Sequence, residues 1–262
     1  MSAEATRAIP GWLAAVVQEL ELGGGHLVTL DDVARARPEL DRALVRQGIA
    51  QLVRRGWLRP VGVRGTYEFI PGAAAGPYPS GDPWLVLRAE LRRHAGAFHV
   101  GATSAAWLLG YAQRSPAPHL VVTTPDVRAP RPLAAAYRLL RTDPAPASGT
   151  VDGLPVPTPP ELFAEVAQLA PRLALDAARG WLRRLLDDVP PGEVSVALND
   201  RGVANRARAG YLAEACGATE HAAAIAALGP LGNGPFYTGP RRVNATFSSR
   251  WRVYDSGRIG VR

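Results

Sequence analysis

The sequence predicts an α+β fold in two domains, and three observations lead to this prediction. The chain has 262 residues, which is long for one domain and comfortable for two. Helical and strand-like segments are mixed without the regular strand–helix–strand alternation of a parallel α/β sheet. A Pro/Gly/Ala-rich, nearly uncharged stretch covers residues 73–83. We therefore expect a first domain at residues 1–72, a linker at 73–83 and an α+β domain at 84–262.

Composition limits the class of protein. Hydrophobic residues make up 47% of the chain, yet no apolar run approaches the eighteen or so residues of a membrane span. The N-terminus lacks the basic-then-apolar plan of a secretion signal, and the single cysteine excludes an internal disulfide. We expect a soluble, cytoplasmic protein. Its formal net charge of +7 favours anionic partners such as nucleic acid.

The first domain begins with the element order of a winged helix-turn-helix. Apolar residues between Trp12 and Leu22 recur at helical spacing, and residues 26–28 form a short predicted strand. Thr29 is suited to be the N-cap of a second helix, with Asp32 three residues later. That helix ends near Pro38, and its shortness fits a helix-turn-helix.

A third helix follows, and its two sides differ. Leu44, Val45, Gly48, Ile49 and Leu52 cluster on one side, whereas the opposite side carries Arg46, Gln47 and Arg54 among alanines. The helix is expected to end at Gly56. Residues 57–70 then alternate around a turn at Arg64 and Gly65, which predicts a β-hairpin, the wing.

This helix and hairpin form the predicted DNA-binding site. Six arginines lie between Arg42 and Arg64 with no acidic residue among them, and guanidinium groups pair well with phosphates. Arg46, Gln47 and Arg54 are expected to contact base edges, because Arg and Gln are donors suited to guanine and adenine. Arg42, Arg59 and Arg64 are expected to hold phosphates of double-stranded operator DNA.

The second domain combines helices and strands. Predicted helices cover residues 84–91, 103–110, 160–170, 173–186, 211–216 and 222–228. Predicted strands cover residues 119–124, 136–141 and 245–254, and residues 151–156 are expected to turn into an edge strand.

No cluster in the sequence predicts a catalytic or metal site, and no cofactor is expected. The five histidines show no metal-ligand spacing and are expected at the surface or hydrogen-bonded in the core. Cys216 is interpreted as a buried structural thiol, and the Asp187–Asp188 and Asn199–Asp200 pairs as polar residues of helix ends or turns. Glu161 and Glu165 share a helix face that is expected to be solvated.

Five segments together resemble the AbiEi-type antitoxins, including mycobacterial members that accompany nucleotidyltransferase toxins. They are LVRRGWLRPVGVRGTYEF, TSAAWLLGY, GLPVPTPPELF, ARAGYLAEACG and SSRWRVYDS, and they span most of the chain. The resemblance implies a cytosolic protein whose winged helix represses its own operon. It also implies a C-terminal domain that counteracts the toxin without forming a stable complex with it. One departure from the family is the third helix, which is longer than the usual Ser/Thr-led recognition helix.

Two alternative functions stay open, and the favoured interpretation assigns no enzyme activity. A winged helix could deliver a nuclease or RNA-processing domain to its substrate, but the chain has no lysine for the Glu-x-Lys element of a nuclease site. A ligand-responsive transcription regulator is the other alternative. The operator sequence, the toxin and the oligomeric state are not predicted by the sequence.

Overall fold

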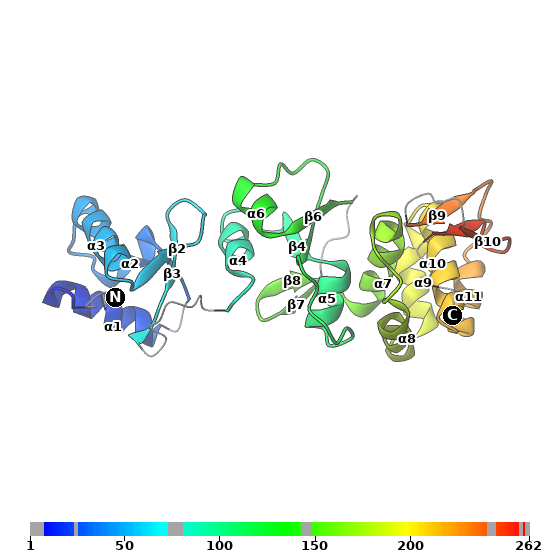
Figure 1. Cartoon of the computed structure of the whole chain (residues 1–262), viewed down its shortest axis with the longest axis horizontal. Helices are drawn as coiled ribbons and strands as arrows, with labels where there is room; N and C mark the ends of the chain where they lie inside the picture. The colour runs from blue at the N-terminus through cyan, green and yellow to red at the C-terminus, as the bar shows by residue number, and fades with distance from the viewer. Residues whose placement is uncertain are drawn as a thin grey trace, which may run out of the picture. The chain divides into compact units, whose positions relative to one another are not determined.

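The computed structural model describes residues 8–23, 26–72, 81–142, 148–239, 245–256 and 259. Their contacts divide into two compact units, each a mixture of helices and small sheets (Figure 1). Unit 1 comprises Met1–Ala95 and Pro130–Ala136, and unit 2 comprises Gly96–Ala129 and Tyr137–Arg262. This composition is consistent with the predicted α+β class.

Unit 1 contains the helices and the hairpin predicted between residues 12 and 70. Its strands form one antiparallel sheet in the order β1-β3-β2. Its elements are α1 (Gly11–Leu22), β1 (Leu27–Thr29), α2 (Leu30–Ala36), α3 (Arg42–Arg54), β2 (Leu58–Pro60), β3 (Thr66–Phe69), α4 (Leu85–Leu91) and α6 (Arg131–Ala136).

The start of α2 confirms the predicted N-cap. The backbone N–H of Asp32 donates to the Thr29 hydroxyl at 3.3 Å, and Asp32 Oδ2 accepts the Thr29 backbone N–H at 2.8 Å. Two backbone donors that the first turn leaves unpaired are thus satisfied reciprocally. The cap fixes where β1 ends and α2 begins.

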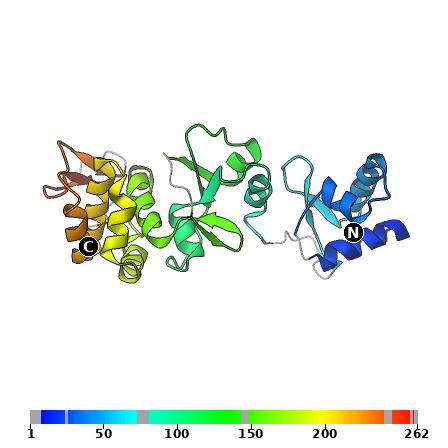
Figure 2. The ribbon, with the colours of Figure 1, turned by 180° about the vertical axis from the view of Figure 1, so that it is seen from behind.

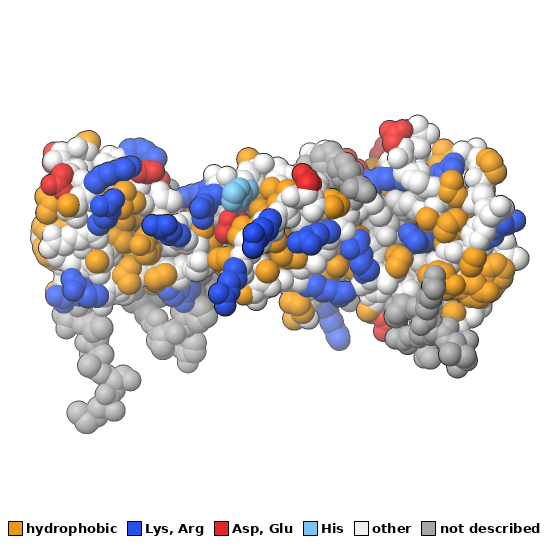
Figure 3. Space-filling view, turned by 90° about the horizontal axis from the view of Figure 1, so that it is seen from above, with side chains coloured by type: hydrophobic (Ala, Val, Ile, Leu, Met, Phe, Trp, Pro, Cys, Tyr) orange, Lys and Arg blue, Asp and Glu red, His pale blue; other side chains and the backbone are white. Residues whose placement is uncertain are grey.

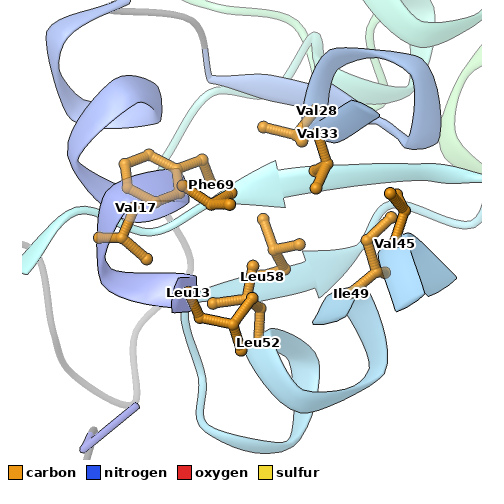
Figure 4. Close-up of a cluster of buried hydrophobic side chains, with 10 residues drawn as sticks. Leu13, Val17, Val28, Val33, Val45, Ile49, Leu52, Leu58 and Phe69 are labelled. Atoms are coloured by element: carbon orange, nitrogen blue, oxygen red, sulfur yellow. The ribbon is translucent and has the colours of Figure 1, made fainter. Parts of the chain in front are cut away.

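A hydrophobic core holds α1, α2 and α3 against the sheet. Figure 4 shows the side chains that converge there from all these elements: Leu13, Val17, Val28, Val33, Val45, Ile49, Leu52, Leu58 and Phe69. Helix α3 approaches α1 closely at Gly48, where an added Cβ would lie 2.9 Å from the Trp12 ring. Leu44, which the helix spacing placed on the same side as Val45 and Ile49, lies in the first turn of α3 and is 42% exposed.

Two elements outside residues 1–72 also belong to unit 1. Leu85 and Ala89 of α4 are buried together with Leu27 and Val63. Helix α6 also packs on α4. The contacts therefore divide the chain after Ala95, whereas the sequence prediction began the second domain at residue 84. Most of the predicted linker, residues 73–80, lies outside the described residues.

The described residues of unit 2 form helices and three small sheets. Figures 1 and 2 show the helices α7, α9, α10 and α11 packed side by side. The strands pair in the orders β4-β5-β6, β7-β8 and β10-β11-β9. The strands are β4 (Phe98–Val100), β5 (Leu120–Thr123), β6 (Arg138–Arg141), β7 (Gly149–Val151), β8 (Leu154–Val156), β9 (Phe236–Thr238), β10 (Thr246–Ser248) and β11 (Val253–Asp255). The helices are α5 (Ala102–Leu108), α7 (Pro159–Leu169), α8 (Arg179–Asp188), α9 (Pro191–Asn199), α10 (Val203–Ala215) and α11 (Thr219–Ala226), with a 3-10 turn at Ala170–Arg172.

Two predictions for unit 2 need correction, and one helix was missed. The helix predicted at residues 173–186 begins only at Arg179, because Leu173 adopts an extended conformation after the 3-10 turn and Leu175 is buried within a loop. The single closing strand predicted at 245–254 is two short strands, β10 and β11, joined by a turn. Helix α9 was not predicted from the sequence.

Candidate nucleic-acid interface

Helix α3 presents a row of basic side chains at one-turn spacing. Arg42, Arg46, Ala50 and Arg54 follow one another at i, i+4 intervals, and all four are exposed. The opposite side of the helix is anchored by the buried residues Val45, Gly48, Ile49 and Leu52. Asp41 is the N-cap of the helix, and its Oδ1 accepts the Leu44 backbone N–H at 2.7 Å. The amphipathic pattern therefore fixes the direction in which the arginines point.

A hollow of about 420 Å³ lies between α3 and the β2–β3 hairpin. Arg46, Ala50 and Arg54 line it from the helix, and Pro60, Gly65 and Tyr67 line it from the hairpin side. The remaining lining residues, Leu30, Ile49 and Val53, make its floor largely apolar. The structure thus brings together Arg46 and Arg54 at one hollow. Gln47 is exposed on α3 and is not one of the residues that line it.

The six predicted contact residues differ in their surroundings. In the described part of the chain, no hydrogen bond or ion pair involves the side chains of Arg46, Arg54 or Arg64. Arg64 is exposed at the turn of the hairpin, where Gly65 adopts a φ of +73°. Figure 3 shows arginine side chains in blue interleaved with apolar ones over the visible face of unit 1.

Two of the predicted phosphate contacts lie next to acidic groups. Arg59 forms an ion pair with Glu68, its cross-strand partner on β3, whose side chain is completely buried. Arg42 lies 3.5 Å from Asp31, and both side chains are largely exposed. The Asp31 pair is worth little because water screens it, whereas the buried Glu68 offsets much of the positive charge of Arg59.

Unit 2 contains a buried polar pair that sequence reasoning missed. Glu165 on α7 has no exposed surface, so the expectation of a solvated face is wrong for this residue. Its Oε2 lies 2.5 Å from Nε2 of His99 on β4, and its Oε1 accepts the Ala102 backbone N–H at 2.8 Å. The sequence did contain a signal for this burial. Leu162 lies three residues before Glu165 and Leu169 four residues after it, so all three share the buried face of the helix.

The other polar residues considered from the sequence are integrated into the fold. His221 is buried with Nε2 2.7 Å from the Val189 carbonyl oxygen, and Cys216 is buried, as expected. Burial raises the pKa of the Cys216 thiol to about 11, so little thiolate forms at neutral pH. Asp187 pairs with Arg183 near the end of α8. Within the described residues, no group of His, Cys, Asp and Glu side chains could hold a metal ion.

These observations define a class of protein with two α+β units, one of which carries an exposed basic helix beside a hairpin. In the described part of the chain, no helix has the length and apolar character needed to cross a bilayer.

A comparison with protein families finds a match that lies mostly in unit 2. Residues 97–215 match the family model described as the AbiEi antitoxin C-terminal domain. This match confirms the resemblance to AbiEi-type antitoxins and supports an antitoxin role in a toxin–antitoxin system.

A solved structure is similar over nearly the whole chain. The crystal structure of the RV2827C protein from Mycobacterium tuberculosis is 26% identical in sequence, with a TM-score of 0.79. The similarity covers 96% of this chain and 94% of that one. No curated protein matches the chain. The solved structure therefore extends the likeness to unit 1, which lies largely outside the matched antitoxin segment.

Proposed function

We propose that the chain is a cytoplasmic antitoxin that also represses its own operon by binding double-stranded operator DNA. Residues 8–72 would act as a winged helix, with α2 and α3 as the helix-turn-helix and β2–β3 as the wing. The order helix, strand, two helices and hairpin, with sheet order β1-β3-β2, supports this interpretation. The proposal assigns the chain no catalytic activity of its own.

The observation that carries the DNA-binding proposal is the exposed row on α3. Arg46 and Arg54 extend from a rigid helix at the same hollow, with no acidic residue lining that hollow. Guanidinium groups held in this way can pair with guanine edges or with phosphates, and the small Ala50 between them allows a groove to approach. Arg64 and Arg42 would contact phosphates on either side. Arg59 would contribute least, because Glu68 already pairs with it.

The antitoxin part of the proposal rests on the matched segment, residues 97–215. By the family resemblance, the cognate toxin would be a nucleotidyltransferase, neutralised without a stable complex. Co-expression with the product of the neighbouring toxin gene tests this directly. Growth should be restored by the full chain and by a variant that carries Arg46→Ala, because operator binding and neutralisation would use different units. Continued growth arrest with the full chain would refute the antitoxin role.

Operator binding needs a separate experiment. The full chain should retard a labelled duplex from the region upstream of its own operon more strongly than a shuffled duplex of equal length and composition. Incubation of the same duplex with the chain and Mg²⁺ should leave it uncleaved, whereas cleavage would favour the tethered-nuclease alternative. Equal affinity for the two duplexes would contradict sequence-specific repression.

A further inference from the structure

The last sheet of unit 2 carries three aromatic side chains in one row. Phe247 on β10 is paired in register with Tyr254 on β11, which is paired in register with Tyr237 on β9. Residues directly opposite each other on neighbouring strands project from the same face of a sheet. The ring centroids of Phe247 and Tyr254 are 4.7 Å apart, and those of Tyr254 and Tyr237 are 5.4 Å apart. The three rings therefore form a continuous aromatic row across the sheet.

The opposite face of this sheet packs against the helices of unit 2. Val253, Asp255 and Thr238, which alternate with the ring-bearing residues, are all buried. Asp255 accepts hydrogen bonds from the Tyr211 hydroxyl of α10 at 2.7 Å and from the Thr238 hydroxyl at 2.9 Å. Helix α10 packs against β9 and β11, and Figure 1 shows β9 beside α10. One face is thus fixed to the core, and the aromatic row lies on the other.

The aromatic row is accessible at its β10 end. Phe247 is 47% exposed, and it is one of few large apolar side chains in the described residues with so much exposed surface. Tyr237 and Tyr254 are partly exposed. Figure 3 shows apolar side chains in orange at the end of unit 2 that carries this sheet. An exposed phenylalanine next to two tyrosines is a surface on which another flat ring can stack.

The charges of this segment are complementary to an anion. From Pro230 to the last residue, the sequence has six arginines and one acidic residue, Asp255. Of the two arginines that the structure describes there, Arg250 forms an ion pair with Glu214 and lies over the Trp251 ring. The Asp255 carboxylate is buried on the helix side and already accepts two hydrogen bonds. Arg252, which directly precedes β11, is exposed. An exposed arginine at the start of β11, together with the aromatic row, fits a ligand that is both aromatic and anionic.

We propose that Phe247, Tyr254 and Tyr237 form a stacking platform for the bases of a single-stranded nucleic acid. Open sheet faces with two or three aromatic side chains bind single strands by stacking, and neighbouring arginines attract the phosphates. The platform lies outside residues 97–215, which match the antitoxin family model. It is also separate from the α3 surface of unit 1, so this inference does not depend on operator binding.

Fluorescence anisotropy with the full chain tests the inference. The probes are fluorescein-labelled oligo-dT and oligo-U of about twelve nucleotides, a length within the usual range of single-strand sites. The full chain should bind at least one strand, and the preferred strand identifies DNA or RNA as the ligand. Phe247→Ala should weaken that binding roughly five- to hundredfold. Val196→Ala, which removes an exposed apolar side chain from α9, is the matched control and should change nothing.

Two further variants separate stacking from other roles of the ring. Phe247→Trp should keep the affinity because it keeps an aromatic face, whereas Phe247→Leu should weaken binding as much as alanine does. Cross-strand aromatic pairs also stabilise a sheet, so the melting temperature of each variant is measured, and the loss of binding should exceed any loss of stability.

Several outcomes would overturn the inference. They are no binding of either strand by the full chain, full affinity in Phe247→Leu, and a loss caused by Arg46→Ala but not by Phe247→Ala. A Phe247→Ala variant that fails to neutralise a toxin, in a chain that binds neither strand, would identify the surface as a protein-docking site instead. Operator affinity should be the same in Phe247→Ala and the unaltered chain, so failure of this inference is distinguishable from failure of the proposed repressor function.

Discussion

Two sets of arginines, one on α3 of unit 1 and one on α8 and α10 of unit 2, occupy contrasting environments. On α3, Arg46 and Arg54 extend from the helix without a hydrogen bond to any residue that the structure describes. On α8 and α10, arginines donate to backbone carbonyl oxygens at 2.5–2.9 Å: Arg183 to Gly217, Arg184 to Tyr111, Arg206 to Leu228 and Arg208 to Tyr237. The same residue type is therefore hydrogen-bonded within the fold on α8 and α10, and exposed without such bonds on α3.

This contrast explains why net charge alone is a weak predictor of function. Arg206 holds the carbonyl of Leu228, just beyond α11, where a helix has unpaired carbonyls and a partial negative charge. Such an arginine adds to the net charge but is not available to a phosphate. Substitution of an arginine on α10 should therefore change the free energy of unfolding, whereas substitution of one on α3 should change the affinity for DNA.

The largest effect is expected at the buried pair of unit 2. Glu165→Ala leaves His99 and the Ala102 N–H without their acceptor in the core, and should lower the free energy of unfolding by about 3–5 kcal/mol. Urea unfolding followed by circular dichroism measures this change. Glu193→Ala, at an exposed glutamate of α9, is the control and should cost far less. A cost below about 1 kcal/mol for Glu165→Ala would show that the pair contributes no more than a surface contact does.

The next effect concerns an internal arginine. Arg206→Met keeps most of the side-chain length but removes the charged donor at Leu228, and should cost about 1.5–3 kcal/mol in the free energy of unfolding. Its affinity for operator DNA should stay unchanged. If Arg206→Met kept full stability but bound DNA more weakly, Arg206 would belong with the α3 arginines, and the proposed difference between the two sets would be wrong.

A change at α3 should give the reverse pattern. Arg46→Ala should cost about 1–3 kcal/mol in binding free energy on operator DNA and less on random DNA, because a base contact is lost. The free energy of unfolding should change by no more than about 0.5 kcal/mol, since the side chain is exposed. Arg114→Ala removes one exposed arginine from unit 2 and is the control for net charge. Equal losses on both kinds of DNA would make Arg46 a phosphate contact.

The smallest effect is expected at the tip of the hairpin. Arg64→Ala should weaken binding almost uniformly across DNA sequences, and should reduce the slope of log K against log salt by about 1. Filter-binding titrations at several salt concentrations measure that slope. An unchanged slope would show that Arg64 does not neutralise a phosphate.

Local sequence patterns predicted unit 1 better than unit 2. The Thr29 cap, the buried face of α3 and the turn near Gly65 depend on residues close together in sequence. The Glu165–His99 pair and the aromatic row depend on strands and helices that meet only in the folded chain. The exposure of Leu44 could not be predicted either, because a helix wheel gives the side of a helix but not the point along it at which the core ends.

The candidate site was also predicted only where it depends on local sequence. The sequence placed Arg46 and Arg54 on the outward side of α3, but it could not show the hollow that joins them to the hairpin. Pairing of Arg59 with Glu68 depends on strand register, which the sequence left open. The assignment of all six residues to DNA stays a prediction.

The most direct test of the central claim is the salt dependence of operator binding by the full chain. If α3 and the hairpin neutralise four to six phosphates, log K should fall with log salt at a slope of roughly −4 to −5. The operator should also be bound more tightly than random DNA at every salt concentration. A slope near zero, or equal affinity for the two DNAs throughout, would contradict the account of unit 1 as an operator-binding surface.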